Sequence, residues 1–211
     1  MLLCDNMEPK KPANSKLRGY AMLKTIGLHF RKIDILNFAI GTVLPIIVLF
    51  VVYSSVKSNT ILQGNDFLSL LMNNKGKFIF YFFVAFIEEI IFRGIIFGVL
   101  LKKGKNKYLS CVVAALIFTL PHIFNTDNIS FSVMFIFPLL YGMFANEMFY
   151  ITKSIWMSTG FHWLWNYIIT SLFLATGTQN LIYVHIIVAM VIMIPLFYII
   201  IRKTSSSGNK F

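Results

Sequence analysis

Residues 78–101 read FIFYFFVAFIEEIIFRGIIFGVLL, an apolar run that carries two adjacent carboxylates and one arginine near its middle. About 20 residues of α-helix cross the hydrocarbon core of a bilayer, so this run is long enough to span a membrane. Three charges near the centre of such a helix cost roughly 8 to 10 kcal/mol of insertion free energy. Charges persist there when they find partners or when function requires them.

The composition of the whole chain predicts the same environment. Of its 211 residues, 57% are hydrophobic and only 13% are charged, and the mean hydropathy is +0.74. We therefore predict an all-α, polytopic integral membrane protein with about six transmembrane helices. The expected spans are residues 34–53, 78–101, 108–124, 129–150, 155–174 and 180–201. They form a transmembrane domain over residues 34–201, between a basic N-terminal segment (1–33) and a short tail (202–211).

The basic residues outside these spans predict the orientation. Fifteen Lys and Arg residues lie on the two termini and on the loops at 102–107 and 151–154, whereas three lie on the other loops. This bias predicts that both termini and these two loops are cytoplasmic, in a multi-pass protein of the cell membrane. The net charge of +11 is thus a topology signal that also favours anionic lipid headgroups, and no nucleic-acid partner is needed to explain it.

Several segments outside the spans carry simpler expectations. Residues 1–16 are polar and are expected to be disordered. Residues 17–33 suit either a helix at the membrane surface or a plain basic flank. The loop at 54–77 is expected outside, with one or two helical turns. A disulfide between Cys4 and Cys111 is not expected, because one lies in a polar tail and the other in a span.

The charged run has one acid that its own helix does not neutralise. Glu89 and Arg93 are four residues apart, so they share a helix face and can form an ion pair, which is the structural interpretation of the motif. Glu88 lies about 100° away round the helix and has no such partner. A lone carboxyl in a low-dielectric site can serve as a base or acid. Glu88 is therefore the candidate catalytic residue.

Few other polar groups occur at membrane depth. His122 lies in the third span, and His162 and Asn166 share one face of the fifth. With Glu88 they supply a base, a proton relay and hydrogen-bond donors, which are the groups needed for water to attack an acyl carbon. Any one of them alone could simply hydrogen-bond between helices. Glu147 and His185 lack a partner at helical spacing and are expected to be structural.

These motifs resemble those of the CAAX protease and bacteriocin-processing family of intramembrane endopeptidases, also called the Abi family. Its pattern is Glu-Glu-x-x-x-Arg, then Phe-x-x-x-His, then His-x-x-x-Asn or Asp. The matching residues are Glu88, Glu89 and Arg93, then Phe118 and His122, then His162 and Asn166. The order, the spacing and the placement in spans all agree, and the resemblance covers roughly residues 78–171.

The resemblance implies cleavage of a peptide bond within or beside the membrane. By position, Glu88 would activate the hydrolytic water, and His122 would hold that water or transfer its proton. His162 and Asn166 would stabilise the oxyanion. The ion-paired acid and arginine of the first motif would orient the site. The implied substrate is a membrane-embedded or membrane-associated protein or peptide.

The family is often labelled a metalloprotease group, and zinc is the alternative to a metal-free site. We expect no cofactor, because catalytic zinc sites typically use three strong ligands plus water, and Glu88 as a ligand would no longer be the base. The zincin signature His-Glu-x-x-His is absent. An aspartyl protease would need two membrane aspartates, whereas Asp34 lies at the edge of a span and Asp127 in a loop. A serine mechanism would have to pair Ser158 with His162.

Two other classes of function stay open at this point. The first is a non-catalytic membrane immunity or interaction protein that binds a toxin, a peptide or a sensor partner. The second is a small transporter, for which intramembrane charges are common, although no internal repeat is visible. Within the protease class, the abundance of Ile, Asn, Lys and Phe indicates an AT-rich bacterial genome. This favours bacteriocin self-immunity or peptide maturation over cleavage of prenylated proteins.

Overall fold

The computed structural model describes residues 15–57, 67–103, 106–124, 131–176 and 179–208. These ranges are built of helices and contain no β-strand, which confirms the all-α prediction. Most of the segment expected to be disordered, residues 1–14, lies outside the described residues, as do Cys4 and Asp127.

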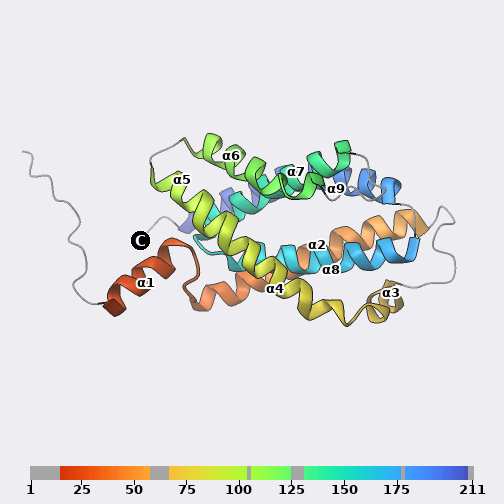
Figure 1. Cartoon of the computed structure of the whole chain (residues 1–211), viewed down its shortest axis with the longest axis horizontal. Helices are drawn as coiled ribbons and strands as arrows, with labels where there is room; N and C mark the ends of the chain where they lie inside the picture. The colour runs from red at the N-terminus through yellow and green to blue at the C-terminus, as the bar shows by residue number, and fades with distance from the viewer. Residues whose placement is uncertain (1–14, 58–66, 104–105, 125–130, 177–178, 209–211) are drawn as a thin grey trace, which may run out of the picture.

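The long helices follow the predicted spans within a few residues, with one exception. In chain order the elements are α1 (Ser15–Thr25), α2 (Lys32–Lys57), α3 (Phe67–Asn73), α4 (Lys77–Glu89), the π-helix η1 (Ile90–Phe97), α5 (Gly98–Lys102), α6 (Lys107–Thr119), the 3-10 turn η2 (His122–Phe124), α7 (Phe131–Thr152), α8 (Trp156–Thr176) and α9 (Gln179–Gly208). The exception is α9, which ends seven residues beyond its span. The elements α4, η1 and α5 form one continuous helical segment, which is the expected second span. Figure 1 shows α2 and α8 side by side, with the segment from α4 to α5 crossing them diagonally.

The predicted number of spans is not confirmed. Among the described residues, three helices are long and apolar enough to cross a membrane: Lys32–Ser54, Lys107–Phe124 and Phe131–Thr152. A shorter apolar helix covers Tyr183–Pro195. The segment from α4 to α5 contains both glutamates and the arginine of the first motif, which lower its apolar content.

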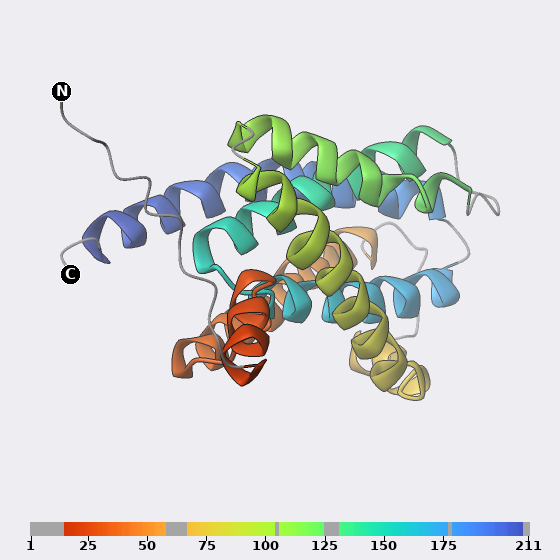
Figure 2. The same ribbon diagram turned by 60° about the vertical axis from the view of Figure 1, so that its left-hand side comes forward.

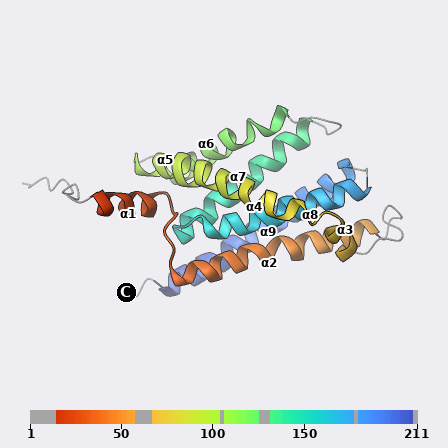
Figure 3. The same cartoon turned by 60° about the horizontal axis from the view of Figure 1, so that its bottom comes forward.

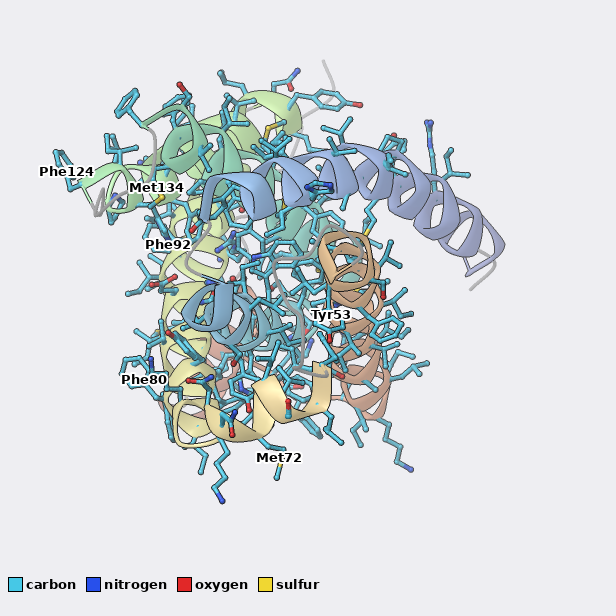
Figure 4. The ribbon with its side chains drawn as sticks, turned by 90° about the vertical axis from the view of Figure 1, so that its right-hand side faces the viewer. Tyr53, Met72, Phe80, Phe92, Phe124 and Met134 are labelled. Atoms are coloured by element: carbon cyan, nitrogen blue, oxygen red, sulfur yellow. The ribbon has the colours of Figure 1, made fainter. Side chains whose placement is uncertain are left out.

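Helix α8 is the centre of the packing. Figure 4, which looks along the helices, shows α8 surrounded by other elements, and it contacts α2, α3, α4, α7 and α9. Its side chains Phe161, Trp165, Ile168 and Leu172 are all almost fully buried in the main hydrophobic core. Since α8 carries the third sequence motif, that motif lies on the most constrained helix of the bundle.

Two glycines allow α2 and α8 to approach closely. A Cβ atom on Gly160 of α8 would lie 2.7 Å from the Phe38 carbonyl oxygen of α2. A Cβ atom on Gly41 of α2 would overlap the Met157 carbonyl oxygen of α8. Small residues at such positions let two helix backbones meet inside a membrane. The close contact fixes the position of α8, and hence of the residues that it presents to α4.

We expect Gly41→Ala to destabilise the fold by about 1–3 kcal/mol, the usual effect of overpacking, because its methyl group meets rigid backbone. The measurement is thermal unfolding of the purified protein in detergent. Gly76→Ala is the matched control, since a Cβ atom there would meet nothing within 4 Å. Equal unfolding midpoints for the two variants would contradict the close α2–α8 contact.

The N-terminal segment is tied to the turn between α7 and α8. Gly27 adopts a left-handed φ of 69° after α1, and its carbonyl oxygen accepts a hydrogen bond of 3.1 Å from the Ile155 backbone N–H. The Arg31 guanidinium donates to Asp34 at 2.9 Å and to the Thr152 carbonyl oxygen at 2.7 Å. Asp34 is therefore part of a structural ion pair, which argues against an aspartyl protease.

Helix α1 and the loops rich in basic residues lie at one end of the bundle. Figure 3 shows α1 at the same end of the bundle as the start of α2 and the end of α9. The side chains of Tyr20 and Met22 on α1 are more than half exposed, in keeping with the surface-helix interpretation of residues 17–33. This is the end of the molecule that the charge bias predicts to face the cytoplasm.

Candidate active site

The first motif lies where a regular α-helix changes to a π-helix. Glu88 and Glu89 are the last residues of α4, and Arg93 lies within η1. A π-helix pairs residues five apart and is rare, but its short segments are frequent at functional sites. The sequence analysis assumed regular helical spacing here and did not predict the π segment.

Glu89 is the hub of the buried polar cluster. Its Oε1 atom lies 2.9 Å from Arg93 Nη1 and accepts hydrogen bonds from His162 Nδ1 at 2.9 Å and from the Tyr141 hydroxyl at 3.1 Å. The side chains of both Glu89 and Arg93 are fully buried. The predicted Glu89–Arg93 pair is thus present, and it extends to α7 and α8.

The guanidinium of Arg93 packs against two neighbouring aromatic rings, whose centroids are 5.5 Å apart. Its Cζ atom is 4.4 Å from the ring centroid of Phe118 and 5.1 Å from that of Tyr141. Such cation–π contacts are strongest where water is excluded. One carboxylate and two ring faces therefore compensate a buried cation, which would otherwise be very costly.

Glu88 lies on the other side of the His162 ring. Its Oε2 atom is 3.5 Å from His162 Nε2, and its side chain is 29% exposed, in contrast to the fully buried Glu89. The Oε2 atom itself is buried and has no hydrogen-bond partner among the described residues. His162 thus bridges the two glutamates. Because the Glu89 carboxylate can only accept, Nδ1 carries a proton and Nε2 is the nitrogen that faces Glu88.

His122 reaches the same region from the end of α6. Its Nδ1 atom lies 2.9 Å from the Phe118 carbonyl oxygen, which can only accept a hydrogen bond, so Nδ1 carries a proton. In the neutral ring, Nε2 is then a hydrogen-bond acceptor. The imidazole packs on the Phe118 ring with centroids 4.6 Å apart, which fixes its orientation.

A small cavity joins the second and third motifs, and we call it the active-site hollow. Its volume is about 50 Å³. The lining residues are Phe118, His122, Phe137, Pro138, Tyr141, His162, Trp165 and Asn166. A water molecule takes up about 30 Å³ of the liquid, so the hollow has room for one or two. The structure therefore brings His122, His162 and Asn166 around one small hollow, whereas Glu88 does not line it and is linked to it through the His162 ring.

Two lining residues were missed by the sequence analysis. Tyr141 joins the cluster through its hydroxyl, and Trp165 is 1% exposed with an Nε1 atom that has no partner among the described residues. A tyrosine in the middle of an apolar span was the available signal for Tyr141. No comparable signal marked Trp165, because an aromatic residue in a span is ordinarily a packing residue.

The remaining polar residues named from the sequence have other contacts. Ser158 is buried, its hydroxyl donates to the Ile155 carbonyl oxygen at 3.0 Å, and its side chain also interacts with the Glu89 carboxylate. Glu147 pairs with Lys107 at 2.7 Å, in keeping with a structural role. His185 lies half-buried on α9.

The described residues do not include a ready-made cluster of metal ligands. Within the described ranges, no three His, Cys, Asp or Glu side chains are grouped closely enough to hold a metal ion. The Nδ1 atom of His162 donates to Glu89 and that of His122 to a backbone carbonyl, which leaves Nε2 of each ring as the nitrogen that could bind a metal.

Comparison with known proteins gives one match. Residues 76–168 match the family described as type II CAAX prenyl endopeptidase, Rce1-like. This range includes all three motifs and all the residues that line the hollow. No curated protein and no solved structure matches the chain.

Proposed function

Because residues 76–168 form a domain of the Rce1-like type II CAAX prenyl endopeptidase family, we propose that this membrane protein is an intramembrane endopeptidase with a glutamate-activated water. The observation that carries the proposal is the position of His162, which lies between the two glutamates and also lines the hollow shared with His122 and Asn166. A purely structural ion pair of Glu89 and Arg93 would need neither Glu88 nor the hollow.

In the proposed reaction Glu88 is the general base. Its carboxylate takes a proton from a water molecule, and the water oxygen forms a bond to the carbonyl carbon of the scissile peptide. The tetrahedral intermediate then collapses: the C–N bond breaks, and the proton on Glu88 passes to the departing nitrogen. The Oε2 atom of Glu88 suits this role because none of the described side chains hydrogen-bonds to it.

The other residues of the hollow have supporting roles. The Asn166 amide and, when its Nε2 atom is protonated, the His162 ring donate hydrogen bonds to the oxyanion. His122 holds the water or moves its proton, since its Nδ1 proton is engaged and Nε2 is the free acceptor of a neutral ring. Glu89 and Arg93 do not touch the reacting atoms but hold the His162 ring in position.

The substrate in this proposal is a peptide or protein within or beside the membrane. Both termini of the enzyme face the cytoplasm, as the basic residues at one end of the bundle favour. Bacteriocin self-immunity or peptide maturation is the proposed role. The test of this function compares cells that make the active chain with cells that make an active-site variant. The secreted and membrane-bound peptides of the two are measured. Identical peptide profiles would contradict it.

We expect Asn166→Leu to lower kcat by about 10²–10³, the usual loss when an oxyanion donor is removed, with a smaller change in KM. The measurement is cleavage of a peptide identified in that comparison, with purified protein in lipid vesicles. Thr170→Val is the matched control, because Thr170 lies one turn further along α8 and its hydroxyl bonds to Tyr81, outside the hollow. Equal losses in kcat for both variants would contradict the role of Asn166.

A further inference from the structure

A second cavity lies at the basic end of the bundle, away from the active-site hollow. Its volume is about 330 Å³, within the range of about 300–1,000 Å³ typical of ligand pockets. Helices α6, α7 and α9 form its walls, and the lining is almost wholly apolar, including Cys111, Leu140, Met143, Phe144 and Ile194. We call this cavity the α9 groove. Figure 2 shows α9 crossing behind α6 and α7 and extending beyond them.

Three cations lie at or near this groove. Lys107 of α6 lines it directly, and the Arg202 guanidinium of α9 lies 5.5 Å from the ring of Tyr198, another lining residue. The Nζ atoms of Lys107 and Lys153 lie 4.1 Å and 3.9 Å from the ring centroid of Tyr150. Lys107 of α6 thus lines the groove, Arg202 of α9 lies against a lining residue, and Lys153, which follows the end of α7, shares the Tyr150 ring with Lys107.

One carboxylate compensates these three cations only in part. Glu147 lines the groove and pairs with Lys107 at 2.7 Å. Lys153 ends α7 in a left-handed conformation with φ of 55°, and burial and the nearby Lys107 lower its pKa. Excess positive charge next to an apolar groove is complementary to a ligand with an anionic head and a hydrocarbon chain.

We propose that the α9 groove binds an acyl chain of an anionic phospholipid, with the lipid phosphate held by Lys107, Lys153 and Arg202. The apolar lining suits hydrocarbon and offers almost no partners for a peptide backbone. Basic pockets between membrane helices on the cytoplasmic side commonly bind anionic headgroups. This site does not depend on the proposed protease chemistry, because none of the residues assigned to that chemistry lines the groove.

The test is a lipid titration of the purified full chain in detergent, followed by native mass spectrometry. The probes are phosphatidylglycerol and phosphatidylcholine with the same acyl chains. We expect phosphatidylglycerol to bind more tightly, and the Lys153→Gln/Arg202→Gln variant to lose about 30-fold in affinity for it. Lys75→Gln/Lys77→Gln is the matched control, with the same loss of charge at exposed positions elsewhere. Equal binding of the two lipids, or an equal loss in the control, would overturn the proposal.

A second pair of variants tests the groove itself. Ile194→Trp fills the α9 groove and should abolish phosphatidylglycerol binding, whereas Ile192→Trp, at a 57% exposed position that does not line it, should leave binding unchanged. Thermal unfolding of each variant verifies that it folds. Inorganic phosphate at the same concentration should not displace the lipid, because the acyl chain supplies much of the affinity. Displacement by phosphate, or unchanged binding in Ile194→Trp, would contradict the proposal.

Discussion

Glu88→Gln is expected to lower kcat/KM for peptide cleavage by about 10²–10⁴ while the protein folds normally. Glutamine has the same size but cannot take a proton from water at neutral pH. The fold should tolerate the change, since the buried Oε2 atom of Glu88 makes no hydrogen bond with the described residues. The measurement is cleavage of a membrane-associated peptide by the purified variant in lipid vesicles, with the unfolding midpoint as the folding check.

The matched control is Glu147→Gln, which changes a glutamate of α7 outside the first motif. That residue pairs with Lys107 and lies outside the active-site hollow, so cleavage should continue near the full rate. A normally folded Glu88→Gln protein that cleaves at the full rate would end the glutamate mechanism. The polar cluster would then be better explained as a binding or structural feature.

Arg93→Met is expected to have the largest effect on stability, about 3–5 kcal/mol, because it leaves the Glu89 carboxylate buried without its cation. Both side chains of this pair are fully buried. The measurement is thermal unfolding in detergent, with the yield of folded protein as a second readout. Lys107→Met removes a cation from a pair that is only partly buried, 23% and 19% exposed, and should cost at most about 1 kcal/mol.

The double variant Glu89→Gln/Arg93→Met separates loss of charge balance from loss of packing. A glutamine oxygen can still accept the bonds from His162 and Tyr141, and no charge is left unpaired. We expect the double variant to be more stable than Arg93→Met alone, since replacing a whole buried pair is often nearly neutral. If the double variant is the less stable of the two, the electrostatic explanation fails.

The local features of the site follow from the sequence. The spacing of four residues was enough to predict the Glu89–Arg93 pair, and the length of each apolar run was enough to predict the helix ranges. How these residues come together in three dimensions was harder to predict from the sequence. At 1.5 Å per residue, counting along the helices placed the four catalytic candidates roughly 10 to 21 Å from the inner face, too wide a spread to predict convergence.

The features that the sequence did not predict all arise from packing between helices. His162 contacts both glutamates because α8 packs directly on α4, and a one-dimensional pattern does not specify which helix faces which. The sequence of the π segment η1 does not distinguish it from an ordinary apolar α-helix. Tyr141 joins the cluster from α7, a helix that carries none of the three motifs.

The close contact between α2 and α8 has a consequence for how relatives of this chain should be compared. The family is recognised over residues 76–168, and α2 ends before that range begins. An alignment of the shared domain therefore does not include α2, the helix that packs against α8 through the two glycines. Two homologues could agree at every motif position and still hold α8 with different scaffolds, and their tolerance to heat and mutation would diverge accordingly.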